Sequence, residues 1–347
     1  NSNATALYSS KDISLVGADV YDSGDTLSIT IVVTERQRVA AIRASSTPGG
    51  DTIAAVLTVD SGAFFDITAN PVVTMSGLTI QETLDDLKPV ITAVQIDYND
   101  GTIVITMSEI INSGSVDLKK MRLINSPGMG LIELENSTLT GSEDYNITVK
   151  LNEDKRVRAI RQSAPVSYGD GGAILFETDD ASIIDIGTNP IAQLTSIYVL
   201  EIADVTIPTI THAFVNYTDG TIHLTFSEII DQSPVADVNL SKFVIRNVSS
   251  EGTGIALTGA TVTSTDGITM NITMTEVQRT LAIAISSTPG GDSYPVVLDI
   301  TAGAIRDITQ NDLADTVNFP VSEYLDIRPP RLVNAEIDYG HGFMLLQ

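Results

Sequence analysis

Short segments in which apolar and polar residues alternate run through the chain. Residues 102–107 (Thr-Ile-Val-Ile-Thr-Met) and 221–226 (Thr-Ile-His-Leu-Thr-Phe) place an apolar side chain at every second position. Because successive side chains of a strand point to opposite faces, this period predicts strands with one buried face. In residues 88–206 the pattern predicts seven strands, near 91–98, 101–107, 120–124, 131–139, 145–151, 172–178 and 194–202.

The strand pattern is interrupted by segments that carry the signals of a helix N-terminus. Thr34 and Thr275 are each followed three residues later by Gln, which is the spacing of a capping box, and both segments end at Pro-Gly-Gly. A more diverged copy begins at Asn152. We therefore predict short crossover helices at 35–43, 153–161 and 276–284.

The same segments recur along the chain, which indicates a repeat architecture. Tyr98, Tyr217 and Tyr339 occupy one position of a recurring motif and are 119 and 122 residues apart. An Asp-Ile-x-x-Asn motif recurs in the same way, beginning at Asp66, Asp185 and Asp307. The predicted domains are repeat 1 (1–87, without its first strands), repeat 2 (88–206, complete), repeat 3 (207–327, complete) and the terminal segment (328–347, the start of a further repeat).

The incomplete repeats at the two ends allow two interpretations. In the first, the repeats continue in a longer polypeptide. In the second, strand 328–340 of one chain completes repeat 1 of the next chain, as in donor-strand addition. The terminal segment has about 20 residues, whereas by alignment with 207–242 repeat 1 lacks roughly 35. This difference in length favours the longer polypeptide.

Seven short alternating strands in about 120 residues are typical of an immunoglobulin-like sandwich. The predicted fold class is all-β: tandem immunoglobulin-like seven-stranded β-sandwiches, each with one short crossover helix. Residues 217–228, Leu-Ser-Lys-Phe (240–243) and Asp-Ile-Thr-x-Asn together resemble the immunoglobulin-like repeats of giant extracellular proteins. These include bacterial adhesins, surface-layer proteins, and flagellar-hair or adhesive-fibre components of algae and protists. The resemblance implies tandem extracellular modules and supplies no catalytic residue.

Composition narrows the possible partners. The formal net charge is −25, from 44 acidic and 19 basic residues, so we expect no binding to nucleic acid or to anionic lipid. No apolar run is long enough for membrane insertion. The chain has no cysteine, and no Ser-His-Asp arrangement or phosphate-binding glycine loop is present in its sequence. We therefore expect that the protein is not an enzyme.

Acidic pairs followed by proline mark each predicted repeat junction. Carboxylate oxygens are the ligands that Ca²⁺ prefers, so these pairs are candidate Ca²⁺ ligands, with Asp66, Asp100, Asp185, Asp219 or Asp307 as further donors. The alternative is that they are solvated linker charges, or acids at strand edges that discourage aggregation. The pairs are Glu82 and Asp85, Glu201 and Asp204, and Glu323 and Asp326.

Asn-x-Ser/Thr sequons are a second class of candidate site, for N-linked glycans. Asn146 and Asn271 fall on the outward side of equivalent predicted strands, where a glycan would stand clear of the core. The alternative is an ordinary strand surface rich in Asn and Thr. The candidates are Asn3, Asn136, Asn146, Asn216, Asn239, Asn247 and Asn271.

These patterns predict a structural segment of an extracellular filament or cell-surface fibre built from tandem repeats. Its partners would be neighbouring repeats of the same long chain, or further copies in a filament. The alternative is an adhesin stalk, or a binding module for a glycan or partner protein, stiffened by Ca²⁺. Aromatic residues make up only 5% of the chain, which favours a stalk over a recognition head.

Overall fold

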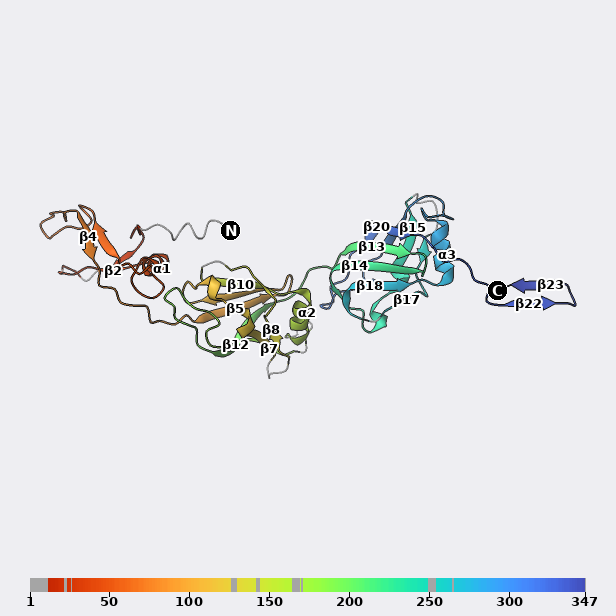
Figure 1. The fold of residues 1–347 in the computed structure, drawn as a ribbon, viewed down its shortest axis with the longest axis horizontal. Coiled ribbons are helices and arrows are strands. Elements are labelled where there is room, and N and C mark those ends of the chain that lie inside the picture. Colours follow the sequence, from red (N-terminus) through yellow and green to blue (C-terminus); the bar gives the residue numbers. More distant parts are fainter. Residues whose placement is uncertain are drawn as a thin grey trace. The chain divides into compact units, whose positions relative to one another are not determined.

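The structure is a computed structural model that describes residues 12–21, 24–25, 27–125, 130–141, 144–163, 169, 171–248, 254–263 and 265–346. It is mostly β-structure arranged in several sheets (Figure 1). The chain divides into two compact units, Asn1–Asp204 and Val205–Gln347. Among the described residues, no helix has both the length and the apolar character needed to cross a membrane.

Repeat 3 contains two sheets with a shared apolar core. The strands are β13 (Ile210–Asn216), β14 (Thr221–Ile230), β15 (Phe243–Asn247), β16 (Ile255–Ala256), β17 (Thr261–Val262), β18 (Gly267–Thr273), β19 (Val296–Ile300), β20 (Thr316–Pro320) and β21 (Ser322–Tyr324). One sheet has the order β17-β18-β14-β13-β21 and the other the order β16-β15-β19-β20. All pairs are antiparallel except β13 with β21, which is parallel.

Alternation along β14 places its apolar side chains in this core. Ile222, Leu224 and Phe226 are buried, as their period-two spacing predicts, and they pack with Tyr217 and Ile272. Two short 3-10 turns, Val235–Asp237 and Leu240–Lys242, connect β14 to β15. The hairpin β13–β14 therefore supplies two neighbouring strands of the five-stranded sheet and apolar side chains of the core.

Repeat 2 has the same sequence of elements. Its strands are β5 (Ile91–Asp97), β6 (Thr102–Met107), β7 (Met121–Asn125), β8 (Ile132–Glu133), β9 (Thr138–Leu139), β10 (Asn146–Lys150), β11 (Ile174–Thr178) and β12 (Leu194–Ile202), with 3-10 turns at Ser113–Ser115 and Leu118–Lys120. Their order is β8-β7-β11-β12-β5-β6-β10-β9, because the first half of β12 pairs with β11 and the second half pairs in parallel with β5. Seven strands were predicted here. The structure has eight, because the predicted strand 131–139 is divided at a turn where Asn136 has a φ of 63°.

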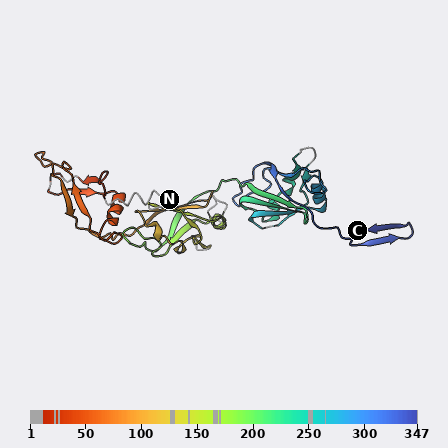
Figure 2. The same ribbon diagram turned by 45° about the horizontal axis from the view of Figure 1, so that its top comes forward.

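Repeat 1 contains fewer strands among its described residues. These are β1 (Asp19–Tyr21), β2 (Thr30–Val32), β3 (Val56–Val59) and β4 (Met75–Thr79), which form two two-stranded sheets (Figure 2). At an offset of 241 residues, β2 corresponds to part of β18, and β3 and β4 correspond to β19 and β20. The described part of repeat 1 holds no counterpart of the hairpin β13–β14.

The three predicted helices are confirmed: α1 (Glu35–Arg43), α2 (Glu153–Gln162) and α3 (Glu276–Ala284). Thr34 and Thr275 both form the complete capping box with the Gln three residues later. Asn152 caps α2 by accepting a hydrogen bond from the Lys155 amide. The cap signals in the sequence therefore fixed the N-terminus of each helix.

The terminal segment forms a hairpin of β22 (Ala335–Asp338) and β23 (Phe343–Leu346) (Figure 1). Within the described residues, these two strands pair only with each other. Gly342 closes the turn with a φ of 71°, a left-handed conformation that glycine adopts without strain. Gly220 has the same value in the turn between β13 and β14.

Candidate functional site

Each of the three helices carries a glutamate at its first position and an arginine three residues later. Residues at this spacing lie on one face of a helix, and an acidic side chain in the first turn is favoured by the helix dipole. The Arg38 Nε donates to Glu35 Oε2 at 2.6 Å. Glu153 with Arg156, and Glu276 with Arg279, form the same pair at 2.7 and 2.8 Å.

Each arginine also binds the aspartate at the end of its own repeat. Nη1 of Arg38 donates to Asp85 at 2.7 Å, Nη1 of Arg156 donates to Asp204 at 2.6 Å, and Nη1 of Arg279 donates to Asp326 at 2.8 Å.. Arg156 and Arg279 donate in addition to the backbone carbonyls of Tyr98 and Tyr217, the tyrosines of the repeated motif. The arginine therefore ties the helix to the end of its repeat and, in repeats 2 and 3, to the hairpin that begins it.

In unit 1 this arginine reaches into the following repeat. The Arg38 Nη2 donates to Glu109 Oε2 at 2.6 Å, and the backbone amide of Ile110 donates to Glu35 Oε1 at 3.0 Å. Both contacts join α1 of repeat 1 to the segment after β6 in repeat 2. These two hydrogen bonds couple the two repeats.

Apolar contacts accompany these ion pairs. Val39 of α1 packs with Ile110 and Ile186 of repeat 2 in a small buried cluster, with Ile42 beside it. The backbone of Gly49 approaches so closely that a Cβ there would lie 1.9 Å from the Ile186 carbonyl oxygen. The contact between repeats 1 and 2 is therefore a packed junction with a polar and an apolar part.

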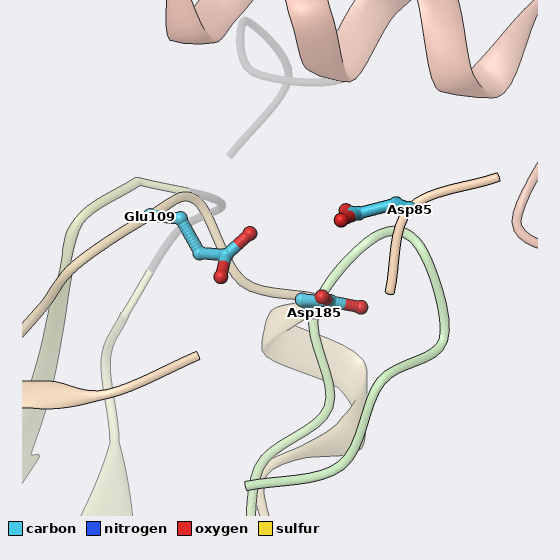
Figure 3. A group of neighbouring side chains, drawn as sticks. All are labelled: Asp85, Glu109 and Asp185. Atoms are coloured by element: carbon cyan, nitrogen blue, oxygen red, sulfur yellow. The ribbon is translucent and has the colours of Figure 1, made fainter. Parts of the chain in front are cut away.

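Three carboxylates converge at this junction from three separate segments (Figure 3). Asp85, Glu109 and Asp185 each offer an oxygen, and these oxygens lie within 4.8 Å of one another. Asp185 is held by Asn189, whose backbone amide and side-chain amide donate to it at 2.7 and 2.9 Å. The Asn189 side chain also donates to the Asp85 carbonyl at 3.1 Å.

Asp85, Glu109 and Asp185 form the junction cluster. Burial and the neighbouring hydrogen-bond donors shift the pKa values of Glu109 and Asp185 in opposite directions. Burial raises the pKa of Glu109 above its usual range, although its hydrogen bond to Arg38 opposes the change. Burial also raises the pKa of Asp185, against the hydrogen bonds from Asn189. The hydrogen bond to Glu35 raises the pKa of Arg38 above its ordinary value, which is already high. The guanidinium is therefore a permanent cation at this junction. Arg38 therefore supplies positive charge to a cluster that could otherwise hold a divalent cation.

The glutamate and the aspartate of each predicted acidic pair bind different groups, and each glutamate binds groups inside its own repeat. Glu201 accepts a hydrogen bond from the Tyr98 hydroxyl, and Glu323 accepts one from the Tyr217 hydroxyl, both at 2.9 Å. Glu82 accepts from the backbone amides of Ser46 and Ala55 at 3.0 Å. The aspartates of the three pairs instead face the arginines.

The further oxygen donors that the sequence suggested lie mostly in their own loops. Asp66 accepts hydrogen bonds from Thr68 and Asn70, which lower its pKa to about 2. Asp100 pairs with Lys150 at 2.7 Å. Asp185 alone of these five joins the junction cluster, together with Asp85 from the predicted pairs. Asp219 and Asp307 bind Thr221 and Asn311 in turns of repeat 3.

Sequence reasoning missed Arg38 and Glu109. Two signals were available: Glu-x-x-Arg recurs at the start of every helix, and Ser-Glu-Ile-Ile recurs at 108–111 and 227–230. Neither recurrence shows that the two motifs meet, because they belong to neighbouring repeats. By position in the repeat, the counterparts of Asp85, Glu109 and Asp185 are Asp204, Glu228 and Asp307.

The sequons differ in how accessible their asparagines are. Asn146 and Asn271 are exposed on β10 and β18, and Asn136 is exposed at its turn. Asn239 is exposed as well, whereas Asn216 and Asn247 are half-buried, and the Asn247 side chain donates to Asp292 at 2.6 Å. Asn3 lies outside the described residues. Glycans at the exposed positions remain a prediction.

No protein-family model and no curated protein sequence matches this chain. Solved structures similar to it include the N-terminal part of the bacterial S-layer protein SbsC, at 12% identity and a TM-score of 0.24 over 55% of this chain. This chain covers 45% of that fragment, which is less than half of its length. Titin domains Z1Z2 in complex with telethonin are similar at 10% identity and a TM-score of 0.18, over 70% of this chain and 98% of theirs. The titin fragment A168–A169 has 10% identity and a TM-score of 0.24, over 68% of this chain and all of its own length.

Proposed function

We propose that this chain is a structural segment of an extracellular filament or cell-surface fibre, built from tandem immunoglobulin-like β-sandwiches. Its role is mechanical, and its partners are the neighbouring repeats. The junction between repeats 1 and 2 is the observation that carries this proposal. A fibre must transmit bending and tension from one module to the next, which requires contacts between modules beyond a covalent linker.

The junction supplies such contacts in a small volume. Arg38 binds acids of both repeats, Glu35 binds the backbone of the second repeat, and Val39 is buried against it. Contacts between domains that move freely are smaller and more polar. The same Glu-x-x-Arg motif and terminal aspartate occur in all three repeats, so the ion pairs on the repeat 1 side of the junction recur in every repeat.

Electron microscopy of the native material tests the proposed function. We expect uniform filaments with a lengthwise period of about 40 Å per repeat, which is the long dimension of a sandwich of short strands. Dispersed globular particles would contradict it.

Ca²⁺ and Arg38 compete for the same carboxylates of the junction cluster. The three carboxylates of the junction cluster are hard oxygen donors of the type that Ca²⁺ binds, but Ca²⁺ takes six to eight oxygens and the guanidinium already binds two of the three acids. We assign the cationic role at this junction to Arg38. Calorimetry with Ca²⁺ tests the assignment: heat of binding in the Arg38→Gln variant and none in the wild type supports it, and equal binding in both contradicts it.

A further inference from the structure

One side of the five-stranded sheet in repeat 3 carries no charged group, although the formal net charge of the chain is −25. The strands β18, β14, β13 and β21 lie side by side in this sheet (Figure 1). In β13, β18, β21 and residues 221–227, the only charged residue is Glu323, which accepts the hydroxyl of the buried Tyr217. The outer face of repeat 3 is the surface that includes His212, Phe214, His223, Asn271, Thr273 and Tyr324.

Three of these residues form one row across three strands. Phe214 of β13 lies opposite His223 of β14, and His223 lies opposite Asn271 of β18. Successive side chains of a strand point to opposite sides, and the neighbours of the three residues point into the core. The buried neighbours are Ala213, Val215, Ile222, Leu224, Met270 and Ile272. The row of Phe214, His223 and Asn271 therefore points away from the core.

Aromatic rings gather around Phe214 on this face. The Phe214 and His223 rings are stacked, with centroids 4.3 Å apart and planes 18° apart. Tyr324 makes an edge contact with Phe214, with centroids 5.4 Å apart and planes 82° apart. A hydrogen bond of 3.1 Å between His223 Nε2 and Thr221 Oγ1 fixes the orientation of the imidazole.

The stack directs one face of the imidazole toward Asn271. Neighbouring strands are about 4.8 Å apart, so two parallel rings at nearly this separation lie beside each other across the strands. Phe214 covers the imidazole face on the side of β13. The opposite face is on the side of β18, where Asn271 is the directly opposed residue.

Asn271 begins the sequon Asn-Ile-Thr, and both Asn271 and Thr273 are exposed. An N-linked glycan begins with N-acetylglucosamine, an uncharged pyranose. The C–H groups of a pyranose carry a small positive charge and are attracted to the negative face of an aromatic ring. A surface without carboxylates also does not favour a cationic partner over a neutral one, so its chemistry suits an uncharged sugar.

Repeat 2 contains a sequon of identical sequence with no ring opposite it. Asn146 of β10, in Asn-Ile-Thr, lies opposite Thr106, and Thr106 lies opposite Ala93. The positions of the row in repeat 3 are occupied in repeat 2 by Gln95, Val104 and Thr148. The combination of a sequon and stacked rings in one row is therefore specific to repeat 3 among these two repeats.

We propose that Asn271 carries an N-linked glycan whose first N-acetylglucosamine packs on the His223 imidazole and continues the stack of His223, Phe214 and Tyr324. The proposal rests on the extracellular location in the proposed function, because N-linked glycans belong to secreted proteins. The glycan covers the outer face of repeat 3 and stabilises this repeat.

Glycopeptide mass spectrometry and NMR of the 347-residue chain, secreted from eukaryotic cells, test the proposal. We expect Asn271 to be occupied. After an endoglycosidase trims each glycan to one sugar, the protons of the sugar on Asn271 should be shifted upfield by the ring current, relative to those of the sugar on Asn146. His223→Val introduces the residue of repeat 2 and should remove this shift. An unoccupied Asn271, or equal chemical shifts of the two sugars, would overturn the proposal.

A double-mutant cycle measures the contact by stability. In the secreted chain, Asn271→Gln should lower the Tm of unit 2 by about 2–4 °C, because one ring contact contributes about 1 kcal/mol. In the His223→Val background the same change should lower it by less than about 1 °C. Asn146→Gln is the matched control and should change the Tm of unit 1 by less than about 1 °C. Equal effects of Asn271→Gln in both backgrounds would contradict the contact.

A free sugar distinguishes the attached glycan from a saccharide of another source. Asn271→Gln is titrated with N,N′-diacetylchitobiose, and NMR follows the His223 ring. We expect binding no tighter than about 1 mM, because the attached glycan depends on the high effective concentration that its covalent bond supplies. Tighter binding of the free sugar would assign the outer face of repeat 3 to a separate saccharide and overturn the proposal.

The outcomes also separate this proposal from the proposed function. If Asn271 is unoccupied while the native material forms filaments, only the glycan contact fails. If the sugar packs on His223 but the native material forms no filaments, the mechanical function fails and the glycan contact stands.

Discussion

Repeats 1 and 3 carry the same helix, the same cap and corresponding strands, yet their apolar residues differ in burial. The helix α1 begins and ends at the positions that correspond to α3, and β4 matches β20. Local structure in both repeats therefore follows local sequence. Burial does not: Ile272 is in a closed core because β14 lies beside it, and Ile31 is half exposed. The comparison teaches that the apolar side chains of β18 are buried because β14 lies beside them, and that local sequence alone does not bury them.

The largest expected difference between the two repeats concerns these isoleucines. Ile272→Ala should lower the free energy of unfolding of unit 2 by about 2–5 kcal/mol, because it leaves a cavity in a closed core. Ile31→Ala should cost unit 1 less than about 1 kcal/mol in the monomer, because its side chain is half exposed. Urea unfolding, with hydrogen exchange to assign each transition, measures both. Equal losses of unfolding free energy would mean that the Ile31 side chain is already buried in a core.

The next effect concerns the arginine that joins repeats 1 and 2. Arg38→Gln should destabilise unit 1 by about 1–3 kcal/mol, because Glu109 and Asp85 lose their charged partner in a partly buried site. Arg36→Gln is the control on the same helix: Arg36 is exposed and pairs with Asp144 at 3.7 Å, so we expect less than about 0.5 kcal/mol. Equal urea midpoints for the two variants would show that the ion pairs of Arg38 do not stabilise unit 1.

A smaller effect distinguishes the two tyrosines. Tyr217→Phe should cost about 1–2 kcal/mol, because Glu323 then loses the hydroxyl that it binds next to the core. Tyr339→Phe should leave the stability of the chain unchanged, because the Tyr339 side chain is exposed. Thermal unfolding of both variants checks this pair. A loss of monomer stability in Tyr339→Phe would be inconsistent with its exposure.

The smallest effect is a pH dependence of the junction in unit 1. The folded pKa values of Glu109 and Asp185 are raised above the unfolded values of about 4, so their contribution to stability is present below pH 4 and is lost as pH rises through the folded pKa values. In unit 2 the pKa of Asp326 is lowered, chiefly by the Arg328 amide and Arg279, so its contribution is present above about pH 4 and is lost as pH falls.

Urea midpoints between pH 4 and 7 measure this difference. Glu109→Gln should flatten the profile of unit 1 by less than about 1 kcal/mol, because one pKa unit corresponds to about 1.4 kcal/mol and Arg38 offsets part of the shift. Glu135→Gln, at an exposed ion pair with Lys119, is the control. A profile of unit 1 that is unchanged by Glu109→Gln would contradict the role given to this acid.

Much of the fold could be predicted because its signals are local. Alternation predicted the strands of repeat 2, and the cap residues Thr34 and Thr275 predicted the helices. The division of the strand predicted at 131–139 was missed, since the sequence does not show that Asn136 adopts a positive φ. The junction cluster was missed in part because Glu109 lies 24 residues from Asp85 and 76 from Asp185. Tertiary contacts decide which acidic residues of two neighbouring repeats lie close together. The spacing of residues within one motif carries no information about these contacts.

Hydrogen exchange of the 347-residue chain tests most directly the claim that β14 buries the apolar face of β18. The account predicts that the amides of β18, which pairs with β14, are strongly protected and that those of β2, which pairs only with β1 among the described residues, exchange much faster. Protection of β2 equal to that of β18 would contradict it.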